Sequence, residues 1–337
     1  MALLWAALPQ LLQQGGWVQG FVLPVLALLV LFSARSFSLM HDCGHGSLFA
    51  TPWLNRALGF VFGVINAIPQ YPWSRGHAFH HKHNGNWSLY RGPSSLLTVE
   101  RFLQLSVAQQ RFYSVSRHPL MLFPGGFFYL IIRPRLQLLL GTLEWLGACL
   151  QLLSREGWRG VLRLRSFTLA FQSSHWYTRG ELLDLIANSA LVLTSWWLMA
   201  SWLGLGVFWA CYATVMTFSA AIFICIFFVQ HNFPDSYANG TEGWSYFKGA
   251  IDGSSNLLMP SVLNWFSADI AFHSIHHLCE RIPNYRLRAC HTKHSHLLAN
   301  SKYLRLSDIP RCFDLILWDS QSCRLVSTSE ALQATPV

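Results

Sequence analysis

Charged side chains are scarce in this chain. Asp, Glu, Lys and Arg make up 12% of its 337 residues, which is about half of the roughly 25% found in ordinary soluble domains. Hydrophobic residues make up 52%. This balance excludes an ordinary soluble fold and indicates an integral membrane protein. The 15 Trp and 10 Tyr fit the aromatic belts that form at membrane interfaces.

Signatures of several other protein classes are missing too. The eight cysteines form no CxxC pair, and Cys149, Cys211 and Cys225 lie within apolar runs, so we expect reduced thiols. No basic segment precedes Leu3, so no cleavable secretory signal is evident. The chain carries no flavin, haem or iron–sulfur signature, so a redox reaction would need electrons from outside.

The net charge of +9 comes from 24 Lys and Arg against 15 Asp and Glu. A basic chain suggests nucleic acid, but here the basic residues lie between apolar runs and not in one patch. Cytoplasmic loops and anionic lipid explain this distribution better. We therefore expect membrane lipid, and no nucleic acid, among the partners.

Three apolar runs are long enough to cross a bilayer as helices, which takes about 20 residues. They are residues 21–40, 182–202 and 205–230. The last two are joined by a short turn around Gly204. They predict a helical hairpin that leaves one face of the membrane and returns to it.

Three other apolar runs fit a full crossing poorly. Residues 1–12 are too short, so they form either an interfacial helix or part of a longer first pass. Residues 54–68 predict a re-entrant or interfacial helix. Residues 120–153 contain Arg133 and Arg135, which make a poor bilayer centre, so we expect an interfacial or dipping element there.

Three short histidine clusters adjoin these apolar runs. In a helix, residues three and four apart lie on one face, so the imidazoles of each cluster would point together. Neutral imidazole is a good ligand for iron, copper, zinc and nickel, and eight such groups exceed what one ion can hold. Two metal ions are the natural interpretation. The candidate ligands, in the clusters HDCGH, HAFHH and HSIHH, are His41, His45, His77, His80, His81, His273, His276 and His277.

The type of metal site follows from what the clusters omit. They contain neither the ExxH pattern of soluble carboxylate di-iron bundles nor the HExxH of zinc proteases. A histidine-rich dinuclear iron site remains. Single histidines often only pack or lie in solvent, but three clusters, two with the same spacing, favour metal. Cys43 and Cys279 adjoin the clusters but would face away from the imidazoles, so we expect them to pack.

Further polar residues lie beside the clusters. His83 follows His80 at a helical spacing and is a weaker candidate ligand. Asp269 precedes His273 by four residues, so it either accepts a hydrogen bond from a ligand N–H or stays solvated. Pro283 is expected to end the helix of the third cluster.

The three clusters, in this order and spacing, resemble the histidine boxes of the membrane fatty-acid desaturase superfamily. The box HDCGHGS and the run HHLCERIPNYRL that starts at His276 resemble the acyl-lipid omega-6 and omega-3 type most. The resemblance covers residues 37–291 and implies an oxygen-dependent enzyme with two iron ions (Fe²⁺) that removes two hydrogens from an acyl chain. It also implies that His231 is a ninth ligand. No catalytic residue apart from the metal ligands is needed, since the cofactor carries the chemistry.

The resemblance also sets the expected fold and partners. We expect an all-α integral membrane protein with few transmembrane helices and a cytosolic helical cap that holds the site. Residues 1–337 would form one domain, with a disordered tail at 320–337, which is rich in Ser, Thr and Gln. The substrate would be an acyl lipid or an acyl thioester. The electron donor would be a ferredoxin or a b-type cytochrome, and a basic cytosolic face suits an acidic donor.

Two other functions stay open. A hydroxylase or ketolase acting on a fatty acid, alkane or carotenoid would have the same site, and only the sequences around the boxes favour the desaturase. A non-catalytic metal-binding or metal-transporting protein would place its ligands deep within spanning helices. The clusters lie instead at the ends of apolar runs. For all of them to meet, an even number of crossings must separate them, as the predicted hairpin provides.

Overall fold

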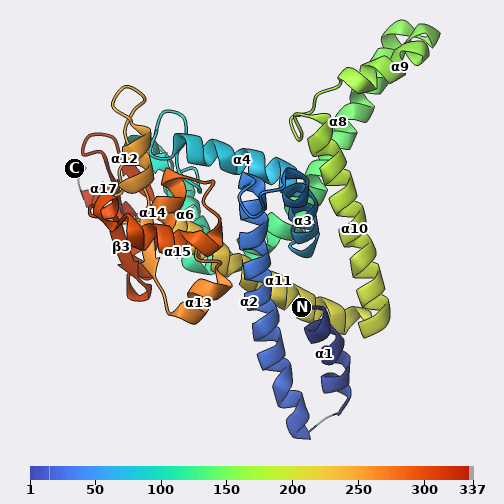
Figure 1. Ribbon diagram of the computed structural model, residues 1–337. Helices are drawn as coiled ribbons and strands as arrows, with labels where there is room; N and C mark the ends of the chain where they lie inside the picture. The colour runs from blue at the N-terminus through green and yellow to red at the C-terminus, as the bar shows by residue number, and fades with distance from the viewer. Residues whose placement is uncertain (15, 334–337) are drawn as a thin grey trace.

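The computed structural model describes residues 1–14 and 16–333, and it is mostly helical, as the sequence predicts (Figure 1). The bundle and its extensions contain α1 (Ala2–Gln14), η1 (Gly16–Phe21), α2 (Val22–His45), α3 (Pro52–Ile65), α4 (Gln70–His83), η2 (Pro119–Met121), α7 (Leu122–Phe127), the π-helical turn η3 (Phe128–Ile132), α8 (Arg133–Glu156), α9 (Trp158–Ala170), α10 (Arg179–Leu203) and α11 (Leu205–Val229). Helices α1, α2, α10 and α11 extend into the lower half of Figure 1.

A cap of short elements lies at the left of Figure 1. It contains β1 (Leu97–Thr98), α5 (Val99–Leu103), α6 (Val107–Ser116), α12 (Tyr246–Ile251), β2 (Ser255–Leu258), α13 (Ser261–Phe266), α14 (His273–Leu278), α15 (Asn284–Lys293), η4 (Ser295–Leu298), β3 (Lys302–Arg305), η5 (Leu306–Asp308), α16 (Ile309–Asp314), β4 (Leu317–Asp319), β5 (Arg324–Val326) and α17 (Thr328–Gln333). Strand β4 pairs in parallel with β1 and antiparallel with β5, and β2 pairs in parallel with β3. These short strands were not predicted.

Four helical runs among the described residues are long and apolar enough to cross a membrane. Three of them contain the predicted spans. Helix α2 ends at Gly46, whose φ of 67° and bond to the Asp42 carbonyl close the helix directly after the first box. Helices α10 and α11 are joined at Gly204, where a φ of 83° requires glycine. The four runs are Gly16–His45, Pro119–Glu156, Arg179–Leu203 and Leu205–Val229.

The remaining run, Pro119–Glu156, continues into an arm that leaves the bundle and returns, at the upper right of Figure 1. The Trp145 indole of α8 donates to the Thr168 hydroxyl of α9 (3.2 Å), so the two helices pack side by side. At the base of α8, the Arg135 guanidinium donates to the Asn188 side chain on α10 (3.0 Å) and to the carbonyl of Ala67. These oxygen atoms accept hydrogen bonds from the Arg135 guanidinium, which lipid chains could not do. The interfacial or dipping placement of this run stays a prediction.

Helix α3 is the short helix predicted for residues 54–68. At its end the Asn66 amide donates to the Ser36 hydroxyl on α2 (2.9 Å). Gly63 lets the chain turn back tightly, since a Cβ there would lie 2.7 Å from the Ile68 carbonyl. Helix α4 therefore starts beside α2, and the second box lies next to the first.

The cap has its own apolar core. Residues 84–118, a polar and mixed segment in the sequence, supply the buried side chains of Leu96, Phe102 and Tyr113. The Tyr113 hydroxyl donates to the Ile316 carbonyl (2.7 Å) and so joins this segment to the last part of the chain.

The expectation of a disordered tail from Ser320 is wrong for residues 320–333. In β5, Leu325 lies opposite Trp318 of β4, and Leu325, Val326 and Ala331 are buried. These apolar side chains close one side of the cap core, while the abundant polar residues around them face outward. Residues 334–337 lie outside the described residues.

Candidate metal centre

Nine histidines from four segments converge where the bundle meets the cap. Their ring nitrogens form two groups, and within each group one atom per residue lies within 4.8 Å of all the others. The five-histidine group comprises His41, His45, His77, His81 and His276, and the four-histidine group comprises His80, His231, His273 and His277. These are the nine residues predicted as ligands. All three boxes therefore meet at one place in the fold.

Helical spacing divides the boxes between the groups. Residues four apart lie on one helical face, so His77 and His81 of α4 join the five-histidine group while His80 points to the other. In α14 the division is reversed, since His273 and His277 belong to the four-histidine group. The rings of His81 and His277 stack at 4.1 Å between centroids. The two groups are therefore in direct contact through this pair of rings.

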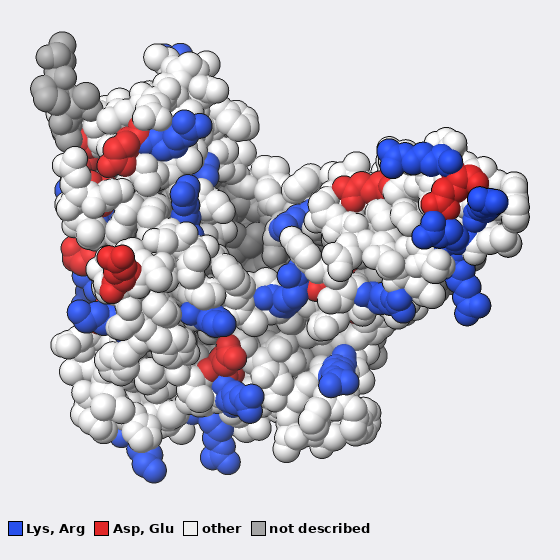
Figure 2. All heavy atoms as spheres, turned by 90° about the horizontal axis from the view of Figure 1, so that it is seen from above, with Lys and Arg blue, Asp and Glu red and all other residues white. Residues whose placement is uncertain are grey.

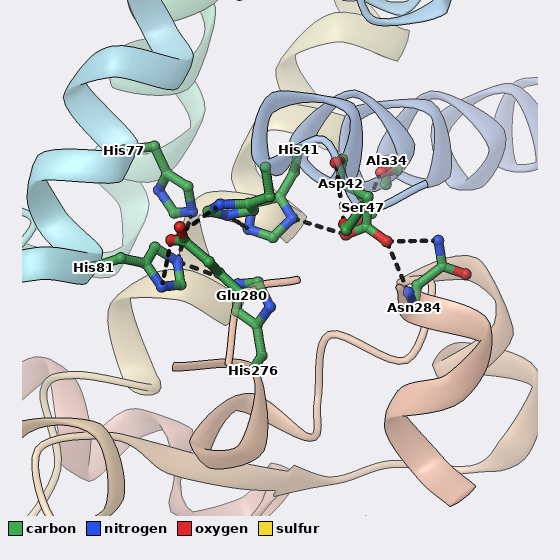
Figure 3. A network of polar contacts seen from close by, with 11 residues as sticks. Ala34, His41, Asp42, Ser47, His77, His81, His276, Glu280 and Asn284 are labelled. Carbon is green, nitrogen blue, oxygen red and sulfur yellow. Dashed lines mark hydrogen bonds and ion pairs between the residues drawn. The ribbon is translucent and has the colours of Figure 1, made fainter. Parts of the chain in front are cut away.

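In the five-histidine group, the Nε2 atoms of neighbouring rings lie close to one another. The Nε2 atoms of His41 and His45 are 3.3 Å apart, those of His77 and His81 are 3.0 Å apart, and those of His81 and His276 are 3.2 Å apart. Figure 3 shows His41, His77, His81 and His276 turned toward one another.

Two carboxylates brace this group from outside. One oxygen of the buried Asp42 lies 3.1 Å from His41 Nδ1, and the other accepts from the Asn284 backbone N–H (2.7 Å) and side-chain amide (2.8 Å). Glu280 lies 3.2 Å from His45 Nδ1. Each acid is placed to accept a hydrogen bond from an Nδ1–H, a tautomer that would turn the Nε2 lone pair inward. Figure 3 shows Asp42 between His41 and Asn284.

Sequence reasoning missed both acids and chose Asp269 instead. Of the two roles left open for Asp269, the structure does not show the hydrogen bond to a ligand, because the Asp269 carboxylate pairs with Arg288 (2.9 Å) while Nδ1 of His273 has no partner among the described residues. The reason is local: Asp269 has a φ of 53° and lies outside the helix that begins at His273. Pro283 does not end the helix of the third cluster, since α14 already ends at Leu278, and it instead directly precedes α15.

The four-histidine group has fewer supports. Its His231 and His273 Nε2 atoms are 3.0 Å apart, and the Gly253 carbonyl lies 3.3 Å from His231 Nδ1. The Nδ1 atoms of His80, His273 and His277 are buried and have no partner among the described residues.

The remaining candidates stay outside both groups. The His83 ring packs at a tilt of 49° against that of Phe79, with 4.4 Å between ring centroids. Neither Cys43 nor Cys279 joins a group. Cys43 is buried, as we expected, whereas Cys279 is exposed and does not pack.

The donor set fits metal ions. Burial, with repulsion between neighbouring imidazoles, holds the pKa of His77, His80, His273, His276 and His277 well below its usual range, and burial lowers the pKa of His231 to about 4. Ring nitrogens of neutral imidazoles lie 3.0–3.3 Å apart, a spacing at which two rings either share an N–H···N hydrogen bond or turn two lone pairs toward one cation. Nitrogens bound at right angles about 2.1 Å from one ion would be about 3.0 Å apart.

Comparison with known proteins decides the family. Residues 15–307 match the model of the family described as fatty acid desaturase. The chain belongs to the fatty acid desaturase family. It is 28% identical to a fatty acid desaturase of Bacillus subtilis over 93% of this chain and 79% of that one. It is 24% identical to the sn-1 oleoyl-lipid 12-desaturase of Synechocystis sp. (76% of this chain, 63% of that one) and 26% identical to the sn-1 acyl-lipid omega-3 desaturase (ferredoxin) of Nostoc sp. (74% and 61%).

This membrane desaturase has a cavity that reaches the histidines. Its volume is about 720 Å³, within the range of about 300–1,000 Å³ typical of ligand sites. His77, His80 and His231 line its inner end together with buried Phe37 and Phe223. Its wall is formed where α7 packs closely on α11. A Cβ on Gly126 would lie 2.7 Å from that of Ala220.

Proposed function

We propose that this chain is an oxygen-dependent acyl-lipid desaturase whose nine histidines hold two iron ions (Fe²⁺). One observation carries the proposal: nine imidazoles converge in two groups at the inner end of a largely apolar cavity. Imidazole suits iron among the transition metals. When bound, the iron would supply the oxygen activation that is needed to break an unactivated C–H bond.

The net reaction balances without a protein acid or base. Two hydrogen atoms leave adjacent methylenes as the double bond forms. Together with two electrons and two protons from outside, they reduce one O₂ to two waters. We propose a ferredoxin as the first donor to test, because the name of the Nostoc relative includes one, and a b-type cytochrome as the second. The site would then face the cytosol, where basic loops are expected.

Aromatic rings of this chain shield the imidazoles on the cavity side. Trp73 stacks on His77 with 4.8 Å between centroids. The Phe227 ring lies 5.7 Å from that of His41 and 5.8 Å from that of His273. We expect these rings to exclude water and to direct one methylene pair toward the histidines.

The fatty acids of a bacterial host that expresses the chain with a ferredoxin test the proposal. Mass spectrometry of total lipids should show new double bonds, and they should vanish with His80→Ala and His81→Ala combined, which removes one imidazole from each group. His83→Ala is the matched control, since it removes a neighbouring histidine that belongs to neither group, and it should keep the products.

Other outcomes would redirect the proposal. Hydroxylated lipids would indicate a hydroxylase on the same scaffold. An unaltered profile with iron bound would point to alkane or carotenoid substrates. Well-folded protein that binds no iron would contradict the metal site itself.

A further inference from the structure

The outer end of the cavity is basic. Its lining includes Arg75, Arg117, Arg133 and the exposed His118, while Glu181 is the one acidic side chain of the lining among the described residues. Figure 2 shows a hollow between the two lobes of the molecule, with Lys and Arg side chains on both sides of it. An acyl chain that reaches the histidines would leave its carrier group at this basic end.

One of the three arginines is already neutralised. The Arg75 side chain forms an ion pair with Glu181, whose side chain is buried. Its guanidinium carbon also lies 4.1 Å from the centroid of the Tyr177 ring. The ion pair joins α4 to α10. Because Glu181 neutralises the charge of Arg75, this arginine is not free to bind an anionic ligand.

Arg117 and Arg133 have no carboxylate partner among the described residues. Arg117 is held in place, since its guanidinium carbon lies 3.6 Å from the Tyr113 ring centroid and it donates to the Ser94 carbonyl (3.1 Å). Its Nε atom is buried without a partner. The exposed Arg133 has its guanidinium carbon 5.2 Å from the Tyr129 ring centroid. Two cations without anions thus line one cavity.

A guanidinium group matches phosphate oxygens in both charge and geometry. We infer that Arg117 and Arg133 bind the phosphate of the group that carries the acyl chain. The carrier is then a phospholipid or a phosphate-bearing thioester, and not a neutral glycolipid or diacylglycerol. This inference rests on the proposed function, because it names the carrier of that reaction's acyl chain.

Lipid binding by the metal-free full-length protein in neutral detergent tests the inference without turnover. The probes are fluorescent phosphatidylglycerol and diacylglycerol with the same acyl chains. Phosphatidylglycerol should bind more tightly by about tenfold or more. Arg117→Gln with Arg133→Gln should abolish this difference, and Lys at both positions should retain most of it. Arg111→Gln, an exposed arginine that does not line the cavity, is the matched control.

Arg133→Gln alone provides a second variant, because Arg117 also supports the Ser94 loop and its loss could disturb folding. It should weaken phosphatidylglycerol binding and leave diacylglycerol binding unchanged. Competition with stearoyl-CoA separates the two sources of phosphate: strong arginine-dependent displacement indicates a thioester, and weak displacement indicates a phospholipid. Equal binding of the two fluorescent lipids, or a preference that survives the double Gln change, would overturn the inference.

Failure of the inference is distinguishable from failure of the proposed function. New double bonds in the host, spread evenly over charged and neutral lipids, would retain the desaturase and remove the phosphate site. Arginine-dependent phospholipid binding without any new double bond would do the reverse.

Discussion

The five-histidine group is braced by carboxylates, whereas the four-histidine group is braced by one backbone carbonyl. Asp42 and Glu280 fix two rings of the first group, while Gly253 fixes one ring of the second. The cavity also differs between them, since it touches His80 and His231 of the four-histidine group but only His77 of the other. The group with fewer ligands and fewer supports therefore lines more of the cavity. Because first-row metals accept up to six ligands, we expect exchange with external ligands to occur there.

Loss of one ligand gives the largest effect and tests the asymmetry directly. His231→Ala leaves three imidazoles in its group, whereas His45→Ala leaves four. Both should lower desaturation by at least about 100-fold. Iron content should differ, falling to near one ion per chain for His231→Ala and staying closer to two for His45→Ala. Elemental analysis of the purified proteins measures this, and equal iron loss in both variants would remove the distinction.

The carboxylates should matter to one group only. Asp42→Asn or Glu280→Gln should weaken iron at the five-histidine group by about 10–100-fold, because the imidazoles lose a partner that orients them and raises their basicity. Chelator titration should then release one ion early and the other at its usual concentration. Asp269→Asn is the matched control, since it breaks only the ion pair with Arg288. Early release of both ions would contradict separate support.

Filling the cavity should reduce turnover without touching either group. A side chain at Gly125, which lines the cavity, would meet no atom within 4 Å of its Cβ. Gly125→Leu should therefore fold normally and lower turnover of long acyl chains by about tenfold, with the iron content unchanged. Gly147→Leu has equal room on α8 but lies outside the cavity lining. It should behave as the wild type, and an equal loss there would refute the cavity as the substrate path.

The smallest expected effect is a loss of stability of the metal-free protein as the pH is lowered. Burial lowers the pKa of His231 from 6.5 to about 4, so between these values the unfolded chain binds a proton that the folded chain does not. Stability therefore falls as pH falls through this window. The Tm of the metal-free protein should drop between pH 7 and pH 5. His231→Gln should reduce that drop, whereas replacement of the exposed His296 should not.

Short-range spacing in the sequence predicts the bundle and draws attention to eight of the nine histidines that converge, whereas His231 was expected from the family resemblance. Apolar runs of about 20 residues predict membrane-spanning helices directly. The spacing of the HxxHH boxes predicts which imidazole rings share a helical face. The residues missed depend on contacts between distant segments. Asp42 is adjacent to His41 and Glu280 follows His277 by three, so a search for acids within a few residues of the boxes would have found both. Their partners across the fold could not be read from spacing.

The cap was harder to predict than the bundle. Its strands have two to four residues, too few for a period to emerge. The tail has a polar composition, and its order depends on Leu325 and Val326 meeting a core built by residues 96–113. Composition alone does not reveal such pairing. Arg117 and Arg133 likewise look like ordinary basic residues until the cavity between them is known.

The bond between Asn284 and Asp42 also has a consequence for biosynthesis. The two residues are separated by 242 positions, so at the usual speed of translation, about 5–20 residues per second, roughly 10–50 s pass between their appearances. During this interval the ribosome also makes His77, His80, His81 and His231, but for most of it each group still lacks the imidazoles of α14. We therefore expect both groups, and the Asn284 support of Asp42, to be complete only after the ribosome has made α14 and α15.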